Sequence, residues 1–218
     1  MQRKVCLETG EIYHVFSKSI AGFVIFNNEA EFERMLLTSA YYQYKNKLQP
    51  FSRYCEFIPK SQLDFSSFRR EGCLVDIAAY CLMPTHVHFV LRQCQDEGIS
   101  MFMRLVLNSY ARYFNVKHAR LGPLWATRFK AVLVDNEEYL YHLTRYVHLN
   151  PVTANLVRRP QDWKYSSYPE YIGLSGPGVI LCQYADLIDM SESLYKDFVE
   201  DGIEYQKERA EAKHVFLE

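Results

Sequence analysis

The stretch CLVDIAAYCLMPTHVHFVLR, residues 73–92, decides the fold. Residues 73–81 are almost wholly apolar and predict a buried strand, and residues 86–92 begin with a polar and apolar alternation that predicts a second strand. Between them, Met83-Pro84-Thr85 predicts a tight turn, because proline fixes its backbone angle and cannot donate to a strand ladder. The two segments are therefore expected to pair as a hairpin.

Periodic segments on both sides of this hairpin extend the pattern. Strands are predicted at residues 11–19 and 128–134, and helices at 29–45, 100–117 and 137–149, with a mixed region at 50–70. Asn27-Asn28 and Asp135-Asn136 are expected to cap two of the helices, and Asn150-Pro151 to end the last. The order βαββαβ followed by a helix predicts an α+β protein with a ferredoxin-like split βαβ fold, in which helices cover one face of an antiparallel sheet.

The composition excludes several classes of protein. The chain has 218 residues, of which 49% are hydrophobic and 15% aromatic, so it is neither disordered nor fibrous. Its longest apolar run is far shorter than the roughly 20 residues that a membrane span needs, and its start lacks a signal-peptide core. The six cysteines lack CxxC spacing, which favours reduced thiols over a zinc cage. We expect a cytoplasmic protein.

The net charge of −1 hides an uneven distribution. From residue 183 onward the sequence has ten acidic and four basic residues, so we predict a main domain at 1–173 and an acidic C-terminal helical extension at 174–218. Residues 104–164 have ten basic and four acidic residues, mixed with aromatic ones. Cations contact phosphates and rings stack on bases, so this region favours single-stranded nucleic acid, although an ordinary solvated face has the same composition.

His86 and His88 are the first residues that suggest chemistry. Side chains at i and i+2 of a strand project to the same face, so the two imidazoles are expected to lie side by side. Two neutral imidazoles form half of a site for a divalent metal. The alternative is a chance pair of ordinary histidines.

Tyr146 and Asn150 lie one turn apart on the predicted helix 137–149 and its end. The Asn150 carbonyl oxygen is a candidate third metal ligand, and the Tyr146 hydroxyl can reach a phosphate held by that metal. The alternative is that Tyr146 is a residue at the edge of the core and that Asn150 is a helix C-cap.

These residues resemble the single-tyrosine transposases that carry a histidine-hydrophobic-histidine (HUH) motif, which include insertion-sequence enzymes and REP-associated tyrosine transposases. The segments that carry the resemblance are AYCLMPTHVHFV at 79–90, YARYFN at 110–115, GPLW at 122–125, RYVHLNPV at 145–152 and WKYSSY at 163–168. They occur in the family's order and cover most of residues 11–173. Thr85 departs from the pattern, because relatives often have asparagine there.

The resemblance implies an endonuclease and transposase that cleaves and rejoins single-stranded DNA flanking a hairpin. His86, His88 and Asn150 would bind Mg²⁺ or Mn²⁺, and Tyr146 would form a 5′-phosphotyrosine; Tyr139 is the next candidate nucleophile. His142 or His148 could assist as a base. A catalytically silent hairpin-binding protein and a zinc hydrolase are the alternatives. Both a homodimer and a monomer occur among the relatives.

For DNA binding, the basic residues of the central region and one tryptophan are the candidates. Arg128 and Lys130 alternate on one predicted strand face, so both could contact one DNA backbone. Trp125 could stack on a base or pack in the core. The full set is Arg112, Lys117, Arg120, Trp125, Arg128, Lys130 and Arg145.

Overall fold

Four strands form one antiparallel sheet in the order β2-β3-β1-β4. The computed structural model describes residues 6–44, 49–57, 72–174 and 180–215, with the side chains of 211–215 left out. The strands are β1 Ile12–Lys18, β2 Val75–Met83, β3 His86–Gln93 and β4 Lys130–Val134. The predicted hairpin is β2 and β3, with Met83 opposite His86.

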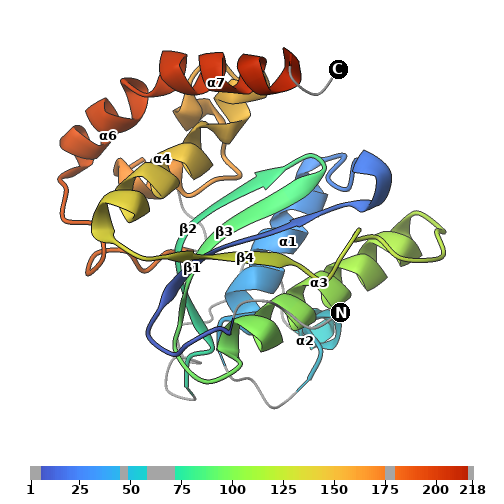
Figure 1. Cartoon of the computed structure of the whole chain (residues 1–218). Coiled ribbons are helices and arrows are strands. Elements are labelled where there is room, and N and C mark those ends of the chain that lie inside the picture. The colour runs from blue at the N-terminus through green and yellow to red at the C-terminus, as the bar shows by residue number, and fades with distance from the viewer. Residues whose placement is uncertain (1–5, 45–48, 58–71, 175–179, 216–218) are drawn as a thin grey trace.

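One face of the sheet is covered by α1 Glu29–Tyr42 and α3 Gly98–Lys117 (Figure 1). Val15, Val87 and Phe89 point from the strands into this layer and are fully buried against the helices. The order of elements and the antiparallel pairing confirm the predicted ferredoxin-like α+β fold, since α1 and α3 are the two helices of the split βαβ motif.

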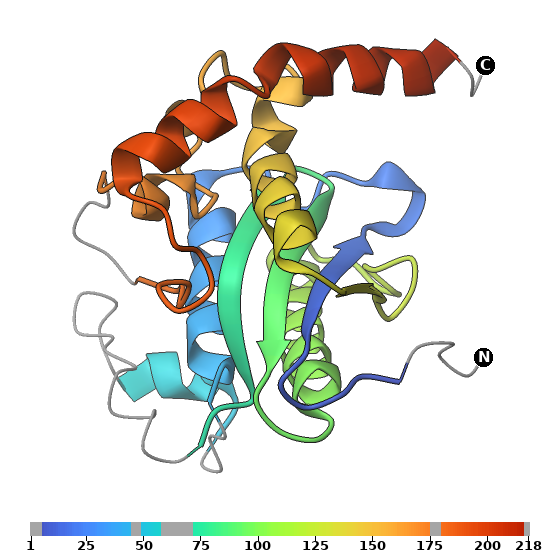
Figure 2. The same cartoon turned by 60° about the vertical axis from the view of Figure 1, so that its left-hand side comes forward.

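The opposite face is partly covered by α4 Glu137–Thr153, which lies in front of the sheet in Figure 2. Leu140, Leu143 and Val147 of α4 form a second buried cluster with Cys81 and Val90 of the sheet, because these apolar residues recur at helical spacing. Helices α6 Glu192–Glu200 and α7 Ile203–Val215 continue this layer, and α6 adds to the same cluster. The C-terminal helices therefore extend the layer that α4 begins.

Four short helices complete the described part of the chain: η1 Ile20–Gly22, α2 Phe51–Phe57, η4 Pro160–Asp162 and α5 Tyr168–Tyr171. Within the mixed region predicted at 50–70, α2 accounts for the first residues, and residues 58–70 lie outside the described ones. Among the described residues, none of the helices combines the length and apolar character that crossing a membrane requires.

The prediction that Asn150-Pro151 ends the helix is wrong, because α4 continues through Pro151 to Thr153. Proline lacks the N–H that would bond the carbonyl of Val147, four residues earlier. The Asn150 side chain replaces that donor: its Nδ2 lies 3.4 Å from the Val147 oxygen and 3.0 Å from the Tyr146 oxygen. Asn150 is therefore inside the helix, and the C-cap is Ala154.

The outer edge of β2 is covered by two later segments of the chain. The Leu82 N–H donates to the Tyr165 oxygen at 2.9 Å, and the Gln183 N–H donates to the Ile77 oxygen at 2.8 Å. An uncovered edge strand would present unpaired backbone groups. Residues on both sides of position 173 thus pair with the same strand of the sheet.

Candidate active site

His86 and His88 lie on the face of β3 that α4 partly covers, and Val87 between them points into the opposite layer. The two imidazole centroids are 5.0 Å apart. The expectation that strand alternation places both rings on one face therefore agrees with the geometry.

Both histidines are neutral at pH 7. Burial, with a smaller contribution from the nearby Lys18, lowers the pKa of His86 to about 4. Burial also lowers the pKa of His88 well below its usual value, with smaller contributions from His14, His86 and Lys18. A neutral imidazole has one unprotonated nitrogen, which is the form that binds a metal.

One ring nitrogen of each histidine is already occupied by a hydrogen bond. His86 Nδ1 lies 2.9 Å from Thr85 Oγ1, and His88 Nδ1 lies 2.9 Å from His14 Nε2. When Nδ1 of each ring carries the proton, Nε2 has a free lone pair, which is the arrangement found in metal-binding histidines. The residues present therefore fit a divalent cation.

Tyr146 comes from α4 and lies edge-on to the histidines. Its ring centroid is 5.9 Å from that of His88 and 6.2 Å from that of His14. Leu143 and Val147 pack against the sheet. Tyr146 lies beside them on α4 and therefore sits at the edge of the contact between the helix and the sheet. Tyr146 is 39% exposed, which leaves its side chain accessible to a large substrate.

The Tyr146 hydroxyl keeps its proton at neutral pH. Partial burial raises the pKa of Tyr146, and a hydrogen bond from the Asn150 side chain opposes that rise. Asn150 also donates to two backbone carbonyls of α4, so its nitrogen is held against the helix and its oxygen is left for another partner. The predicted one-turn relation of Tyr146 and Asn150 is present, and both contact each other.

Two residues of β1 that the sequence analysis did not single out belong to this site. His14 contacts His88, and Lys18 is paired in register with His86. Alternation along residues 12–18 places His14, Phe16 and Lys18 on one face. A ferredoxin-like order places that strand beside β3, so the two patterns together would have indicated them.

The predicted DNA-binding residues are spread over both faces of the sheet. Lys130 is paired with Phe16 in β4, and its Nζ lies 6.0 Å from the Phe16 ring, on the histidine face. Arg128 is exposed but precedes β4, so the prediction that it shares a strand face with Lys130 is wrong. The chain turns at residues 126–128 and enters the strand only at Lys130.

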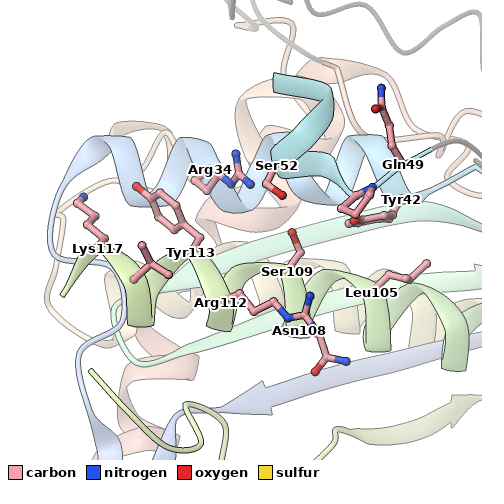
Figure 3. Close-up of a pocket in the computed structure, with 12 residues that line it drawn as sticks. Arg34, Tyr42, Gln49, Ser52, Leu105, Asn108, Ser109, Arg112, Tyr113 and Lys117 are labelled. Carbon is pink, nitrogen blue, oxygen red and sulfur yellow. The ribbon is translucent and has the colours of Figure 1, made fainter. Parts of the chain in front are cut away.

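Arg112 and Lys117 lie on α3, on the other side of the sheet from the histidines. Both line a cavity of about 900 Å³ between α1, α2 and α3, with Arg34 of α1 across from them (Figure 3). Lys117 is not free in this cavity, because its Nζ lies 2.7 Å from the buried carboxylate of Glu31.

The other three candidates have structural contacts. Arg120 donates to the carbonyl oxygens of Gly122 and Pro123 and so holds its own loop. Trp125 donates from Nε1 to the Leu107 oxygen at 3.0 Å and packs against the core, so packing accounts for this ring. The Arg145 guanidinium lies 4.4 Å over the ring of Phe198 in α6.

The two histidines considered as bases also have partners. His142 Nδ1 lies 2.9 Å from Arg145 Nη2. His148 is fully buried, with Nε2 at 2.8 Å from Ser167 Oγ and Nδ1 at 2.9 Å from the Tyr195 hydroxyl. His148 therefore supports the packing of α4 and α6 rather than facing a substrate.

Comparisons with known proteins found a family model and a solved structure that are similar to this chain. A family model described as "Transposase IS200 like" matches residues 67–150, a range that contains His86, His88, Tyr146 and Asn150. No curated protein matches the chain. A solved structure of a REP-associated tyrosine transposase bound to a REP hairpin is similar at a TM-score of 0.52 and 13% identity, covering 87% of this chain and 98% of the other; at that identity the likeness concerns the fold. Over residues 67–150, the chain is similar to the IS200-like transposase family.

Proposed function

We propose that this protein is a transposase and endonuclease that cleaves and rejoins single-stranded DNA beside a hairpin, with Tyr146 as the nucleophile. The observation that carries the proposal is the placement of an accessible tyrosine on α4, with its ring 5.9 Å from that of His88 in a pair of neutral histidines. The family match supports a transposase, and the REP hairpin held by the solved structural neighbour motivates a hairpin substrate.

His86 Nε2, His88 Nε2 and the Asn150 amide oxygen are the proposed ligands of a divalent cation, Mg²⁺ or Mn²⁺. When bound, such an ion polarises the scissile phosphate and stabilises the charge on the leaving oxygen. The hydrogen bonds that His88 and His86 donate to His14 and Thr85 orient the two imidazoles, and the exposed Lys18 places a positive charge beside His86.

Tyr146 Oη attacks the phosphorus as its proton is removed, and the bond from phosphorus to the 3′-oxygen breaks. The 3′-oxygen takes up a proton and leaves as a hydroxyl, while the 5′-phosphate stays on the tyrosine. A 3′-hydroxyl from a second strand reverses these steps and seals a new junction. Because burial raises the pKa of Tyr146, the deprotonation is a separate requirement of the first step.

For DNA positioning we propose Lys130, because it lies on the histidine face. Arg128, just before β4, and Arg112, in the cavity on α3, are proposed as outer contacts of a substrate large enough to extend around the protein. A homodimer stays a prediction. A DNA substrate of this kind places the protein in the bacterial cytoplasm, at the nucleoid.

The test is a covalent-adduct assay with labelled single-stranded hairpin DNA from the flanks of the gene, with Mn²⁺ or EDTA. Wild type should form an adduct that survives denaturing gels and requires metal. Tyr146→Phe should form none, while the matched control Tyr139→Phe, on the same helix, should form it normally.

If Tyr146→Phe still forms the adduct and Tyr139→Phe does not, Tyr139 is the nucleophile instead. If the protein binds several flanking hairpins but forms no adduct with any of them, it is a catalytically silent DNA-binding protein and not an enzyme. Esterase activity without an adduct would favour a zinc hydrolase.

A further inference from the structure

A second group of metal-ligand side chains lies at the other end of the β2–β3 hairpin. Cys73 precedes β2, Asp76 is in β2 and Cys94 follows β3. β3 begins at His86 and has eight residues, so at about 3.4 Å per residue this group is roughly 25 Å from the His86 end. It is therefore a separate place from the active site proposed above.

The three side chains are close enough to share one ion. One Sγ from each cysteine and one carboxylate oxygen of Asp76 all lie within 4.8 Å of one another. The measured distance from Cys73 Sγ to Asp76 Oδ1 is 3.4 Å. Zinc bond lengths of about 2.3 Å to sulfur and 2.0 Å to oxygen at tetrahedral angles put these two atoms roughly 3.5 Å apart. Cys73 Sγ and Asp76 Oδ1 are thus already separated by the distance expected between two ligands of a tetrahedral zinc ion.

Arg92 orients the Asp76 carboxylate and places a positive charge beside it. Its Nη2 and Nε donate to Asp76 Oδ2 at 2.7 and 3.0 Å, so Oδ1 is the oxygen turned to Cys73. Carboxylate ligands of metals are commonly hydrogen-bonded in this way. Two thiolates and a carboxylate total −3, of which a divalent cation would offset two charges; the Arg92 guanidinium lies beside the remaining charge and also pairs with Asp186.

We propose that Cys73, Asp76 and Cys94 bind one Zn²⁺, with a water in the fourth position. Soft thiolates with a carboxylate favour zinc over the hard cations Mg²⁺ and Mn²⁺. Both cysteines bind zinc as thiolates, so binding releases thiol protons. The ion would join the residues that enter β2 and leave β3, and so fix the open end of the hairpin.

The test is a Co²⁺ titration of the reduced, metal-stripped protein, followed by competition with Zn²⁺. Wild type should develop one equivalent of a thiolate-to-cobalt charge-transfer band, together with the visible absorption of tetrahedral cobalt, and Zn²⁺ should remove both. Cys94→Ser should lose the charge-transfer band or reduce it by about half. Asp76→Asn should weaken binding at least tenfold.

Two control variants test whether the band arises from these three side chains. Cys55→Ser, at another half-buried cysteine, and His88→Ala should both keep the full band, so the result does not depend on the DNA chemistry proposed above. Absence of a band in the reduced wild type, or an unchanged band in both Cys94→Ser and Asp76→Asn, would overturn the proposal. A Cys73–Cys94 disulfide in air, with no cobalt band after reduction, would also overturn it.

Discussion

His88 and Phe89 are neighbours on β3, yet they belong to opposite faces of the sheet. Phe89 is fully buried between the strands and α3, with its ring 5.8 Å from that of Phe102. His88 faces Tyr146 and His14. Both side chains are almost inaccessible, so burial does not distinguish them. They differ in the partners that surround them.

The difference separates stability from chemistry within one strand. The face toward α1 and α3 is continuous apolar packing, where a lost side chain leaves a cavity. The other face holds neutral imidazoles, each with one ring nitrogen in a hydrogen bond, where a lost side chain would remove a proposed metal ligand. Substitutions at adjacent positions should therefore have opposite signatures.

Phe89→Ala should give the largest effect. Removing a buried phenyl ring typically costs about 3–5 kcal/mol of unfolding free energy, because the cavity is only partly refilled. Urea unfolding followed by circular dichroism measures the change. Phe57→Ala, at a side chain that is 70% exposed, is the matched control and should lose well under 1 kcal/mol. Equal losses of unfolding free energy in Phe89→Ala and Phe57→Ala would contradict the view that packing on this face stabilises the fold.

His88→Ala should show the reverse signature. The lost hydrogen bond to His14 is worth about 1 kcal/mol of unfolding free energy, whereas loss of a proposed metal ligand should lower the rate of adduct formation on the order of 100-fold or more. Urea unfolding and the adduct assay in Mn²⁺ measure the two quantities. A variant that unfolds as easily as Phe89→Ala, or that still forms adduct at the wild-type rate, would contradict the assignment.

Local sequence patterns predicted which side chains share the face of the sheet that holds the two histidines. Alternation alone placed His86 and His88 together, and the side chain of Asn136 does cap α4, accepting from the Tyr139 N–H at 2.7 Å. The helix end at Pro151 was wrong because a side chain, Asn150, replaced the missing backbone donor. A local rule cannot anticipate such a replacement.

Long-range pairs account for most of what the sequence did not reveal. His14 and His88 are 74 positions apart, and Cys73 and Cys94 are brought together by the pairing of β2 with β3. Lys117 was predicted to contact DNA from its charge, but the structure pairs it with Glu31, which is far away in the sequence. A residue's charge is visible in the sequence, whereas its partner depends on the packing of α1 against α3.

Glu31 gives the stabilising face a pH dependence. Burial raises its pKa, but hydrogen bonds from Lys117, Asn27 and His118 outweigh that effect and lower it from 4.5 to about 2. The stabilisation is therefore present above pH 4.5 and lost as the pH falls toward 2. We expect the ionised Glu31 to contribute about 2 kcal/mol to the unfolding free energy, after allowance for solvent screening at Lys117. The unfolding free energies of wild type and Glu31→Gln should converge over this window.

The matched control is Glu29→Gln, at an exposed carboxylate that pairs with Lys164. Its difference from wild type should be small at every pH, because exposed ion pairs contribute little. A Glu31→Gln difference that stays constant from pH 6 to pH 2 would show that the ion pair is not the cause.

The smallest expected effect compares two lysines from opposite faces. Lys130→Gln removes a charge beside the histidines, so affinity for single-stranded hairpin DNA should fall a few-fold and the slope of log affinity against log salt should decrease by about 0.7. Lys117→Gln should leave that slope unchanged, because Glu31 already pairs with this charge. Fluorescence anisotropy between 50 and 200 mM salt measures both slopes. If Lys117→Gln reduces the slope and Lys130→Gln does not, the DNA lies on the α3 side, and the histidine face is not where the substrate binds.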